Sequence, residues 1–339
     1  MYVLVALLLL SLLIVVHEGG HYMAARLCGI EVREFSLGMG PLLLRRINRN
    51  GTQFSLRPIP IGGYCAFYGE DEETDDPRGF NHQPVWKRAV TVASGPLMNF
   101  VLAIVAVVLY LSLVGVPAAV NRVDTVEPPA RSAGLLPGDE IMSVNGKSLS
   151  EVIEISQAIS ESDGQAVRLT VRRGGENVDL TLTPFFDQEL SRWRVGFTFG
   201  QGRERIPLLR SIPFSFQYNA ENATLIVRTL RNLVTRGEGI NDVSGPVGTV
   251  AVISEVTQQA GFDILFDLAA VISINLGIMN LLPIPGLDGS RLLFLLVEAI
   301  RRRPVRRELE GAIHMAGLVL LLMLSVALTY KDILRILHP

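Results

Sequence analysis

Two histidines and a glutamate follow a long uncharged stretch at the start of the chain, in the order His17-Glu18-Gly19-Gly20-His21. Because His17 and His21 are four residues apart, a helix places both imidazoles on one face, where they can reach a single ion. Glu18, next to the first histidine, can face a water molecule bound to that ion. The spacing therefore predicts one zinc ion with a general base beside it, which is hydrolytic chemistry.

The position of these residues in the chain supports the same interpretation. The sixteen residues before His17 contain no charged side chain. At about 1.5 Å per residue in a helix, they carry the chain roughly 24 Å into a hydrocarbon layer about 30 Å thick. Ionisable groups at such depth are costly and normally face a protein interior or a water-filled cavity. We therefore expect His17 and His21 to be metal ligands rather than structural histidines of a helix.

A zinc ion in a hydrolytic site needs a third protein ligand and one open position for water. Asp288 is favoured because it lies in "NLLPIPGLDGSRLL", where two prolines and two glycines interrupt the helix pattern after a later apolar segment. If that segment and the first one cross the membrane in the same direction, their inner ends lie at the same depth. An ordinary turn residue is the competing interpretation of Asp288. Weaker alternatives for the third ligand are His82, His314, His338 and Cys28.

The composition is that of a membrane protein. The 339 residues are 49% hydrophobic and 19% charged, with a mean hydropathy of +0.35. A net charge of −2 gives no sign of a basic surface for nucleic acid. Four segments approach the roughly 20 apolar residues that cross a bilayer: Tyr2 to about Ala25, about Val90 to Val114, about Ile264 to Leu282, and Ala312 to Tyr330. We expect an α-helical integral membrane protein with four transmembrane helices, surrounded by a lipid bilayer and without a nucleic-acid partner.

Arginine and lysine residues indicate the orientation of these helices. They gather between the first and second spans and again in "RRRPVRR", Arg301 to Arg307. Such loops are usually cytoplasmic. Both chain ends and the segment from about Gly115 to Phe262 are then expected outside, with the active site towards the cytoplasmic side.

Between the second and third spans the pattern changes to short β-rich runs with turns, from Val120 to about Pro184. An apolar strand, Glu140 to Val144, ends in the hairpin-forming pair Asn145-Gly146. The run "EVIEISQAI" predicts a helix, and "AVRLTVRRGGENVDLTLTP" predicts a hairpin around Gly174-Gly175. These features predict one small β-rich α+β domain inserted outside the membrane.

The run "SAGLLPGDEIMSVNG" within this region resembles the PDZ domain of bacterial envelope proteases. PDZ domains take an extended peptide, often a C-terminus, onto a sheet edge. A β-rich spacer without a ligand is the alternative. Further on, "PFSFQYNAENATLIVRTLRNLVTRGEG" predicts an amphipathic helix that lies either on the membrane surface or on the protein itself.

Three motifs in this order resemble the site-2 protease family, specifically the bacterial RseP-like (regulator of sigma-E protease) intramembrane zinc metalloproteases. They are "HEGGH" in a first transmembrane helix, a PDZ-like run, and "NLLPIPGLDG", which matches N-x-x-P-x-x-x-x-D-G after a later helix. The resemblance implies zinc on His17, His21 and Asp288, Glu18 as general base, and Asn280 near the substrate backbone. It also implies that "TQFSLRPIPIGGYCAFY" forms a membrane-associated β-hairpin that offers an edge to an extended substrate.

The same resemblance implies the substrates and the cellular location. Substrates would be single-pass membrane proteins, such as anti-sigma factors or signal-peptide remnants, cleaved in regulated intramembrane proteolysis in the bacterial cytoplasmic (inner) membrane. A trimmed substrate terminus would bind or be sensed at the PDZ domain. The pair Gly19-Gly20 departs from the bulky residue that family members often carry there, and we expect it to loosen the helix locally.

The expected organisation has four parts. Residues 1–115 hold the first two spans and the hairpin, 116–186 the PDZ domain, 187–261 an extracytoplasmic linker with the amphipathic helix, and 262–339 the last two spans. Two functions without proteolysis are alternatives: a membrane scaffold that uses the PDZ domain, and an intramembrane metal transporter. A transporter has no need of Glu18, a carboxylate beside the metal that is not a ligand.

Overall fold

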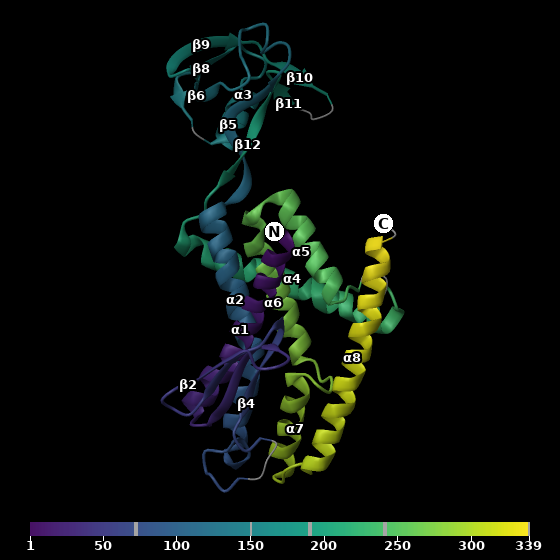
Figure 1. The fold of residues 1–339 in the computed structure, drawn as a ribbon. Coiled ribbons are helices and arrows are strands. Elements are labelled where there is room, and N and C mark those ends of the chain that lie inside the picture. Colours follow the sequence, from purple (N-terminus) through teal and green to yellow (C-terminus); the bar gives the residue numbers. More distant parts are fainter. Residues whose placement is uncertain (71–73, 150, 189–191, 240–242, 338–339) are drawn as a thin grey trace. The chain divides into compact units, whose positions relative to one another are not determined.

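The computed structural model describes residues 1–70, 74–149, 151–188, 192–239 and 243–337 (Figure 1). The chain forms two compact units. The first unit combines Met1–Tyr110 with Leu208–Pro339, and the second is the intervening segment Leu111–Pro207.

Each of the four apolar segments forms a helix that is long and apolar enough to cross a membrane. The four helices are α1 (Tyr2–Cys28), α2 (Val85–Leu109, continued by a π-helical turn, Tyr110–Val114), α6 (Leu265–Leu281, after a 3₁₀ turn, Phe262–Ile264) and α8 (Arg307–Leu337). Helices α1, α2 and α8 extend beyond the segments expected from hydropathy, whereas α6 lies within its expected segment.

Helix α1 ends at Cys28, about two turns after His21. Gly29 adopts the left-handed conformation (φ 76°) that favours glycine. The Gly29 N–H donates to the Arg26 carbonyl, and the Ile30 N–H donates to the Ala25 carbonyl at 2.8 Å. These bonds satisfy carbonyl groups in the last turn of the helix. After this turn the chain enters a β-sheet that lies against α1.

This sheet has four strands in the order β2-β3-β1-β4, with β1 parallel to β3 and antiparallel to β4. The strands are β1 (Val32–Met39), β2 (Leu44–Ile47), β3 (Gln53–Leu56) and β4 (Ile59–Phe67). The expectation of a hairpin over "TQFSLRPIPIGGYCAFY" is wrong, because β1 lies between β3 and β4. Phe35 of β1, for example, is in register with Phe54 on one side and Cys65 on the other.

The chain crosses over β1 between β3 and β4. The crossing lies at Gly38 (φ 82°), where a Cβ would lie 2.7 Å from the carbonyl oxygens of both Arg57 and Ile59. The Arg57 side chain then secures the crossing, since it donates to Ser36 Oγ and to the Glu34 carboxylate, each at 3.0 Å. A side chain larger than glycine at residue 38 would obstruct this path.

Three further helices complete the first unit: α4 (Leu208–Arg236), α5 (Pro246–Ala260) and α7 (Asp288–Arg301). Helix α4 is the expected amphipathic helix, and it packs against α2 and α6. The Tyr218 hydroxyl of α4 donates to Asp267 at the start of α6. Helices α5 and α7 were not expected; α5 packs between α1 and α8, and α7 packs against α2.

Ion pairs and close backbone contacts hold α7 and α8 in place. Arg88 of α2 is only 8% exposed and donates through both terminal nitrogens to Glu298 of α7. On α8, the Asp332 carboxylate accepts the Gly248 N–H of α5 at 2.7 Å. Gly317 of α8 packs against the Pro285 backbone so closely that a Cβ there would clash. Helix α8 thus contacts the broken segment that precedes Asp288.

The second unit contains a sheet in the order β12-β5-β6-β8-β9, with the short β7 paired to β6, and one helix, α3. The expected strand, helix and hairpin are confirmed: Asn145 and Gly146 both have positive φ after β6, and Gly174-Gly175 joins β8 to β9. The elements are β5 (Val116–Val126), β6 (Glu140–Val144), β7 (Lys147–Ser148), α3 (Val152–Ser160), β8 (Val167–Arg173), β9 (Glu176–Leu182), β10 (Phe185–Asp187), β11 (Arg192–Arg194) and β12 (Phe197–Glu204).

The boundary expected at residue 186 is too early. Strand β12 pairs antiparallel with β5 from Phe197 to Glu204, so the sheet needs residues beyond 186. Val195 is also buried in the same apolar core as Ile141, Leu169 and Ile155. The compact unit accordingly runs to Pro207.

A buried carboxylate, Asp139, lies at the edge of this core. It is 1% exposed and accepts the Leu136 N–H at 2.9 Å and two donors of the Arg173 guanidinium at 2.8 and 2.7 Å. The hydrogen bonds from Arg173 hold the pKa of Asp139 below its usual range. Since the folded-state pKa is lowered, this pair stabilises the unit above the ordinary aspartate pKa and ceases to do so as the pH falls through the folded-state value.

We therefore expect Asp139→Asn to lower the urea midpoint of the second unit at pH 7, and the difference from wild type to shrink as the pH falls below about 4. Trp193 reports on this unit by fluorescence in a Trp86→Phe background, because the chain contains only these two tryptophans. Asp124→Asn, which alters an exposed side chain on β5, is the control. A difference that stays constant down to pH 3 would contradict the role given to the Asp139 carboxylate.

Candidate metal centre

His17 and His21 lie on one face of α1, as the four-residue spacing predicts. Their rings are nearly perpendicular, with centroids 4.9 Å apart, and their Nε2 atoms are 3.3 Å apart. Both side chains are largely shielded, with exposed fractions of 12% for His17 and 8% for His21. The two Nε2 atoms therefore point to one place beside the helix.

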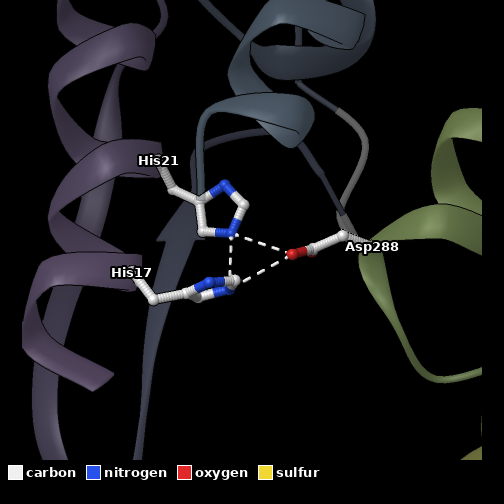
Figure 2. Close-up of side chains that lie close together, drawn as sticks. All are labelled: His17, His21 and Asp288. Atoms are coloured by element: carbon white, nitrogen blue, oxygen red, sulfur yellow. Dashed lines mark hydrogen bonds and ion pairs between the residues drawn. The ribbon is translucent and has the colours of Figure 1, made fainter. Parts of the chain in front are cut away.

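Asp288 reaches that place from a different part of the chain. Helix α6 ends at Leu281, the chain passes through the broken segment, and α7 begins at Asp288. The Asp288 Oδ2 atom lies 3.2 Å from His17 Nε2 and 3.3 Å from His21 Nε2 (Figure 2). The structure thus brings together the three side chains that the sequence selected as candidate ligands.

The geometry of these three atoms fits a shared metal ion. Despite the short distances, Asp288 Oδ2 is buried and has no hydrogen bond of acceptable geometry among the described residues. The three ligand atoms all lie within 4.8 Å of one another. Ligand atoms about 2.0–2.1 Å from a tetrahedral zinc ion are about 3.3–3.4 Å apart, which matches the sides of this triangle. Two imidazoles and one carboxylate are also a donor set that zinc prefers.

The orientation of His21 is set by α2. Its Nδ1 atom lies 2.9 Å from the Thr91 carbonyl oxygen, which can only accept a hydrogen bond. The proton must therefore be on Nδ1, and Nε2 carries the free electron pair that a metal ion requires. The ring lies against Gly95, where any Cβ would clash with it.

Gly20 allows α1 and α2 to approach each other. A Cβ at Gly20 would clash with the Ser94 carbonyl and the Met98 side chain of α2, whereas Gly19 has open space beside it. Helix α1 continues without interruption from Tyr2 to Cys28. The helix thus has no break at Gly19-Gly20, and close helix packing accounts for Gly20.

The Glu18 side chain extends from α1 towards β4. A Cβ on Gly63 of β4 would lie 3.5 Å from Glu18 Cγ, and the main chain of Cys65 is within hydrogen-bonding reach of the Glu18 carboxylate. Glu18 does not belong to the three-atom triangle. It is therefore a carboxylate next to the candidate metal centre that is not one of its three ligand atoms.

Three of the four alternative third ligands, Cys28, His82 and His314, do not lie at this site. Cys28 is buried in an apolar cluster with Ala25 and Ile30, and the His82 ring hydrogen-bonds to the Thr74 carbonyl. His314 Nδ1 accepts the Gly286 N–H at 3.3 Å. His338 lies outside the described residues. Among the described residues, His17, His21 and Asp288 form the one group whose ligand atoms all lie within 4.8 Å of one another.

Asn280 is the residue expected near a substrate. It lies in the last turn of α6 and is half-buried, eight residues before Asp288. Two residues near the triangle, Thr91 and Asn99 of α2, received no role from the sequence. The only signal was the stretch "PVWKRAVTVASGPLMNF", whose polar residues have the spacing of one helix face.

Comparisons with known proteins agree with this chemistry. The model of Peptidase family M50 matches residues 5–324. Proteins named "Putative zinc metalloprotease" are similar along nearly their whole length: one from Brucella suis is 33% identical (96% of this chain, 93% of the relative), and one from Nostoc is 34% identical (98% and 96%). One from Clostridium acetobutylicum is 31% identical (98% and 97%).

A solved structure resembles part of the chain. It is the PDZ domain of an SdrC-like protein from Listeria monocytogenes, 24% identical, and the match covers 24% of this chain and 84% of that one. The TM-score of 0.20 is too low for this match to establish the fold of the second unit.

The match to the family model extends from the first transmembrane helix into the last one. The relatives are similar over the same range. The resemblance to site-2 proteases is therefore confirmed: the chain belongs to Peptidase family M50 and is a membrane-embedded metallopeptidase.

Proposed function

We propose that this protein is an intramembrane zinc metalloprotease that hydrolyses peptide bonds in or near the transmembrane segment of single-pass membrane proteins. Anti-sigma factors and signal-peptide remnants are the substrate types that the family suggests, in regulated intramembrane proteolysis. The observation that carries the proposal is the triangle of His17, His21 and Asp288 with Glu18 beside it, on helices apolar enough to span a membrane.

The proposed orientation follows from the charged loops. Arginines on and around β2, and those after α7, favour a cytoplasmic location for these segments in the bacterial inner membrane. Both chain ends and the second unit then lie outside. The metal centre lies near the cytoplasmic ends of α1 and α6, within reach of water from that side.

His17, His21 and Asp288 would hold one zinc ion, and Glu18 would act as general base. When bound, zinc supplies Lewis-acid activation of water and of the scissile carbonyl group. Glu18 accepts the proton of the attacking water on its carboxylate and then gives it to the leaving amine nitrogen. The apolar surroundings of α1 limit the access of further water, which strengthens these electrostatic interactions.

We propose that the substrate is held as an added strand on β4. One edge of β4 pairs with β1, and no described strand pairs with its other edge. The close approach of Gly63 to Glu18, the proposed general base, supports this choice of strand. A transmembrane substrate helix hides its amides in internal hydrogen bonds, so pairing with β4 would stabilise the unwound form that cleavage requires. Asn280 would contact the substrate backbone.

We further propose that the second unit is a PDZ domain that binds a trimmed substrate terminus. Strand β12 is the outer strand of its sheet. A groove of about 230 Å³ lies beside this strand and α3, and its lining includes Ser156, Ile159, Phe197 and Phe199 together with Arg192 and Arg194. An apolar side chain fits such a lining, and the arginines suit a terminal carboxylate.

Glu18→Gln is expected to reduce cleavage of a tagged single-pass substrate at least about 100-fold, because it removes the general base. Zinc content should stay at the wild-type value, since Glu18 is not a ligand. Glu255→Gln, on the exposed surface of α5, serves as the matched control. Unchanged cleavage in Glu18→Gln would refute the proteolytic mechanism and would leave a scaffold or a transporter as the alternatives.

Asp288→Ala should lower zinc affinity strongly, because it removes one of the three proposed ligands. The expected loss exceeds the roughly 10–100-fold that follows when a residue hydrogen-bonded to a ligand is removed. Metal analysis of the purified protein, before and after treatment with a chelator, measures this. Wild type is expected to hold about one zinc per chain, and the exposed Asp124→Ala should match it. Equal zinc content in Asp288→Ala and wild type would rule out Asp288 as a ligand.

Ser156→Tyr should fill the groove of the second unit and weaken binding of a peptide with an apolar C-terminal residue at least roughly tenfold. The size-matched control is Gln157→Tyr, on the exposed side of the same helix. Fluorescence anisotropy measures peptide binding to the full-length protein, with one peptide that has a free C-terminal carboxylate and one whose C-terminus is amidated. Equal binding by both variants would contradict the proposed groove.

A further inference from the structure

The two histidines of the proposed zinc site differ in the partner of their Nδ1 atoms. His21 faces a main-chain carbonyl, whereas His17 faces a side chain. His21 Nδ1 faces the Thr91 carbonyl oxygen, whereas His17 Nδ1 lies 3.2 Å from the side-chain amide of Asn99. Asn99 is completely buried in α2. An asparagine side chain carries both a donor and an acceptor, so its orientation decides where the proton of His17 resides.

We propose that Asn99 is a positioning residue that directs the free electron pair of His17 to the metal ion, an inference that rests on the proposed zinc site. In this role, Asn99 Oδ1 accepts a hydrogen bond from His17 Nδ1–H. That bond keeps the proton away from Nε2, the atom that lies 3.2 Å from Asp288 Oδ2.

In the structure, the nitrogen of the Asn99 side-chain amide lies 3.2 Å from His17 Nδ1, and Asn99 Oδ1 is buried with no hydrogen-bond partner among the described residues. The two ends of an amide have the same shape, so a rotation of 180° exchanges the nitrogen and the oxygen within the same space. In that orientation Oδ1 accepts from His17 Nδ1–H, and His17 Nε2 keeps the electron pair that a metal ligand needs.

The backbone around Asn99 is fixed independently of its side chain. Ser273 of α6 is fully buried and donates to the Asn99 carbonyl oxygen at 2.9 Å. This contact anchors α2 to α6 at the level of His17. The position of the Asn99 main chain therefore does not depend on the hydrogen bonds of its side-chain amide. A variant at Ser273 separates the role of the backbone from that of the side chain.

The competing explanation is that Asn99 merely stabilises helix packing, as polar residues do between membrane helices. Asn99→Leu keeps the approximate size but removes the acceptor. It should weaken zinc binding roughly 10–100-fold, the range for loss of a partner that orients a ligand. Asn99→Asp retains an acceptor oxygen next to Nδ1 and should keep zinc affinity within about threefold of wild type. Ser273→Ala should bind zinc like wild type.

Two measurements on the full-length protein in detergent test this: competition with a chromophoric zinc chelator, and the thermal midpoint of the metal-free form. A loss of zinc affinity in Asn99→Leu, rescue in Asn99→Asp, and a metal-free thermal midpoint within a few degrees of wild type for all variants would support the proposal. Equal zinc affinity in Asn99→Leu and wild type would overturn it and leave the zinc site standing. Equal losses in Asn99→Leu and Asn99→Asp would also overturn it.

If wild type itself binds no zinc, the proposed function fails, and the inference about Asn99 falls with it. Wild-type binding with an unaffected Asn99→Leu variant rejects only the inference. The two failures are therefore distinguishable in one titration series. Absorption of the cobalt-substituted protein adds a second readout, since a misoriented His17 should change the ligand-field bands of Asn99→Leu and not those of Ser273→Ala.

Discussion

The convergence of two imidazoles and one carboxylate inside an apolar layer is the interaction on which the rest of this structure depends. A carboxylate removed from water is unfavourable unless opposite charge or donors compensate it. Asp288 has two imidazole nitrogens at 3.2 and 3.3 Å and no other ligand-forming group in the described cluster. A cation held by these three side chains would provide that compensation. Binding of such an ion would then stabilise the local fold as well as the site.

Helix α2 serves as the template for the two histidines. Thr91, Gly95 and Asn99 are four residues apart and share one face of the helix. His21 contacts Thr91 and Gly95, and His17 contacts Asn99, so α1 and α2 run antiparallel with matching spacing. Gly20 permits the close approach of the two helices at this point. Ligand orientation is thus a property of the helix pair rather than of α1 alone.

Much of the fold and the candidate site can be predicted from local sequence patterns. The spans follow from hydropathy, β6 and its turn from a strand that ends in Asn145-Gly146, and the pairing of His17 with His21 from helical spacing. Asp288 is predictable because proline and glycine residues in "NLLPIPGLDG" interrupt an apolar helix. Within a bilayer such an interruption leaves backbone groups without hydrogen bonds, which is costly. Each of these inferences needs only a few neighbouring residues or the thickness of a bilayer.

The expectations that failed concern contacts between distant segments. The sheet order places β1 between β3 and β4, and nothing in "TQFSLRPIPIGGYCAFY" encodes the strand that separates its two halves. The pairing of β12 with β5 joins residues about 80 positions apart, so the domain boundary at 186 was too early. The role of Gly20 depends on Ser94 and Met98, which belong to another helix. Local patterns carry no information on such partners.

The contact of Gly317 with Pro285 gives the last helix a part in the chemistry that its apolar composition does not suggest. Hydrogen at the α-carbon of residue 317 is the only substituent that fits against the backbone of the interrupted segment. Helix α8 therefore constrains the path of the chain at Pro285, three residues before Asp288. Close packing at a glycine without any reactive group therefore helps to position Asp288.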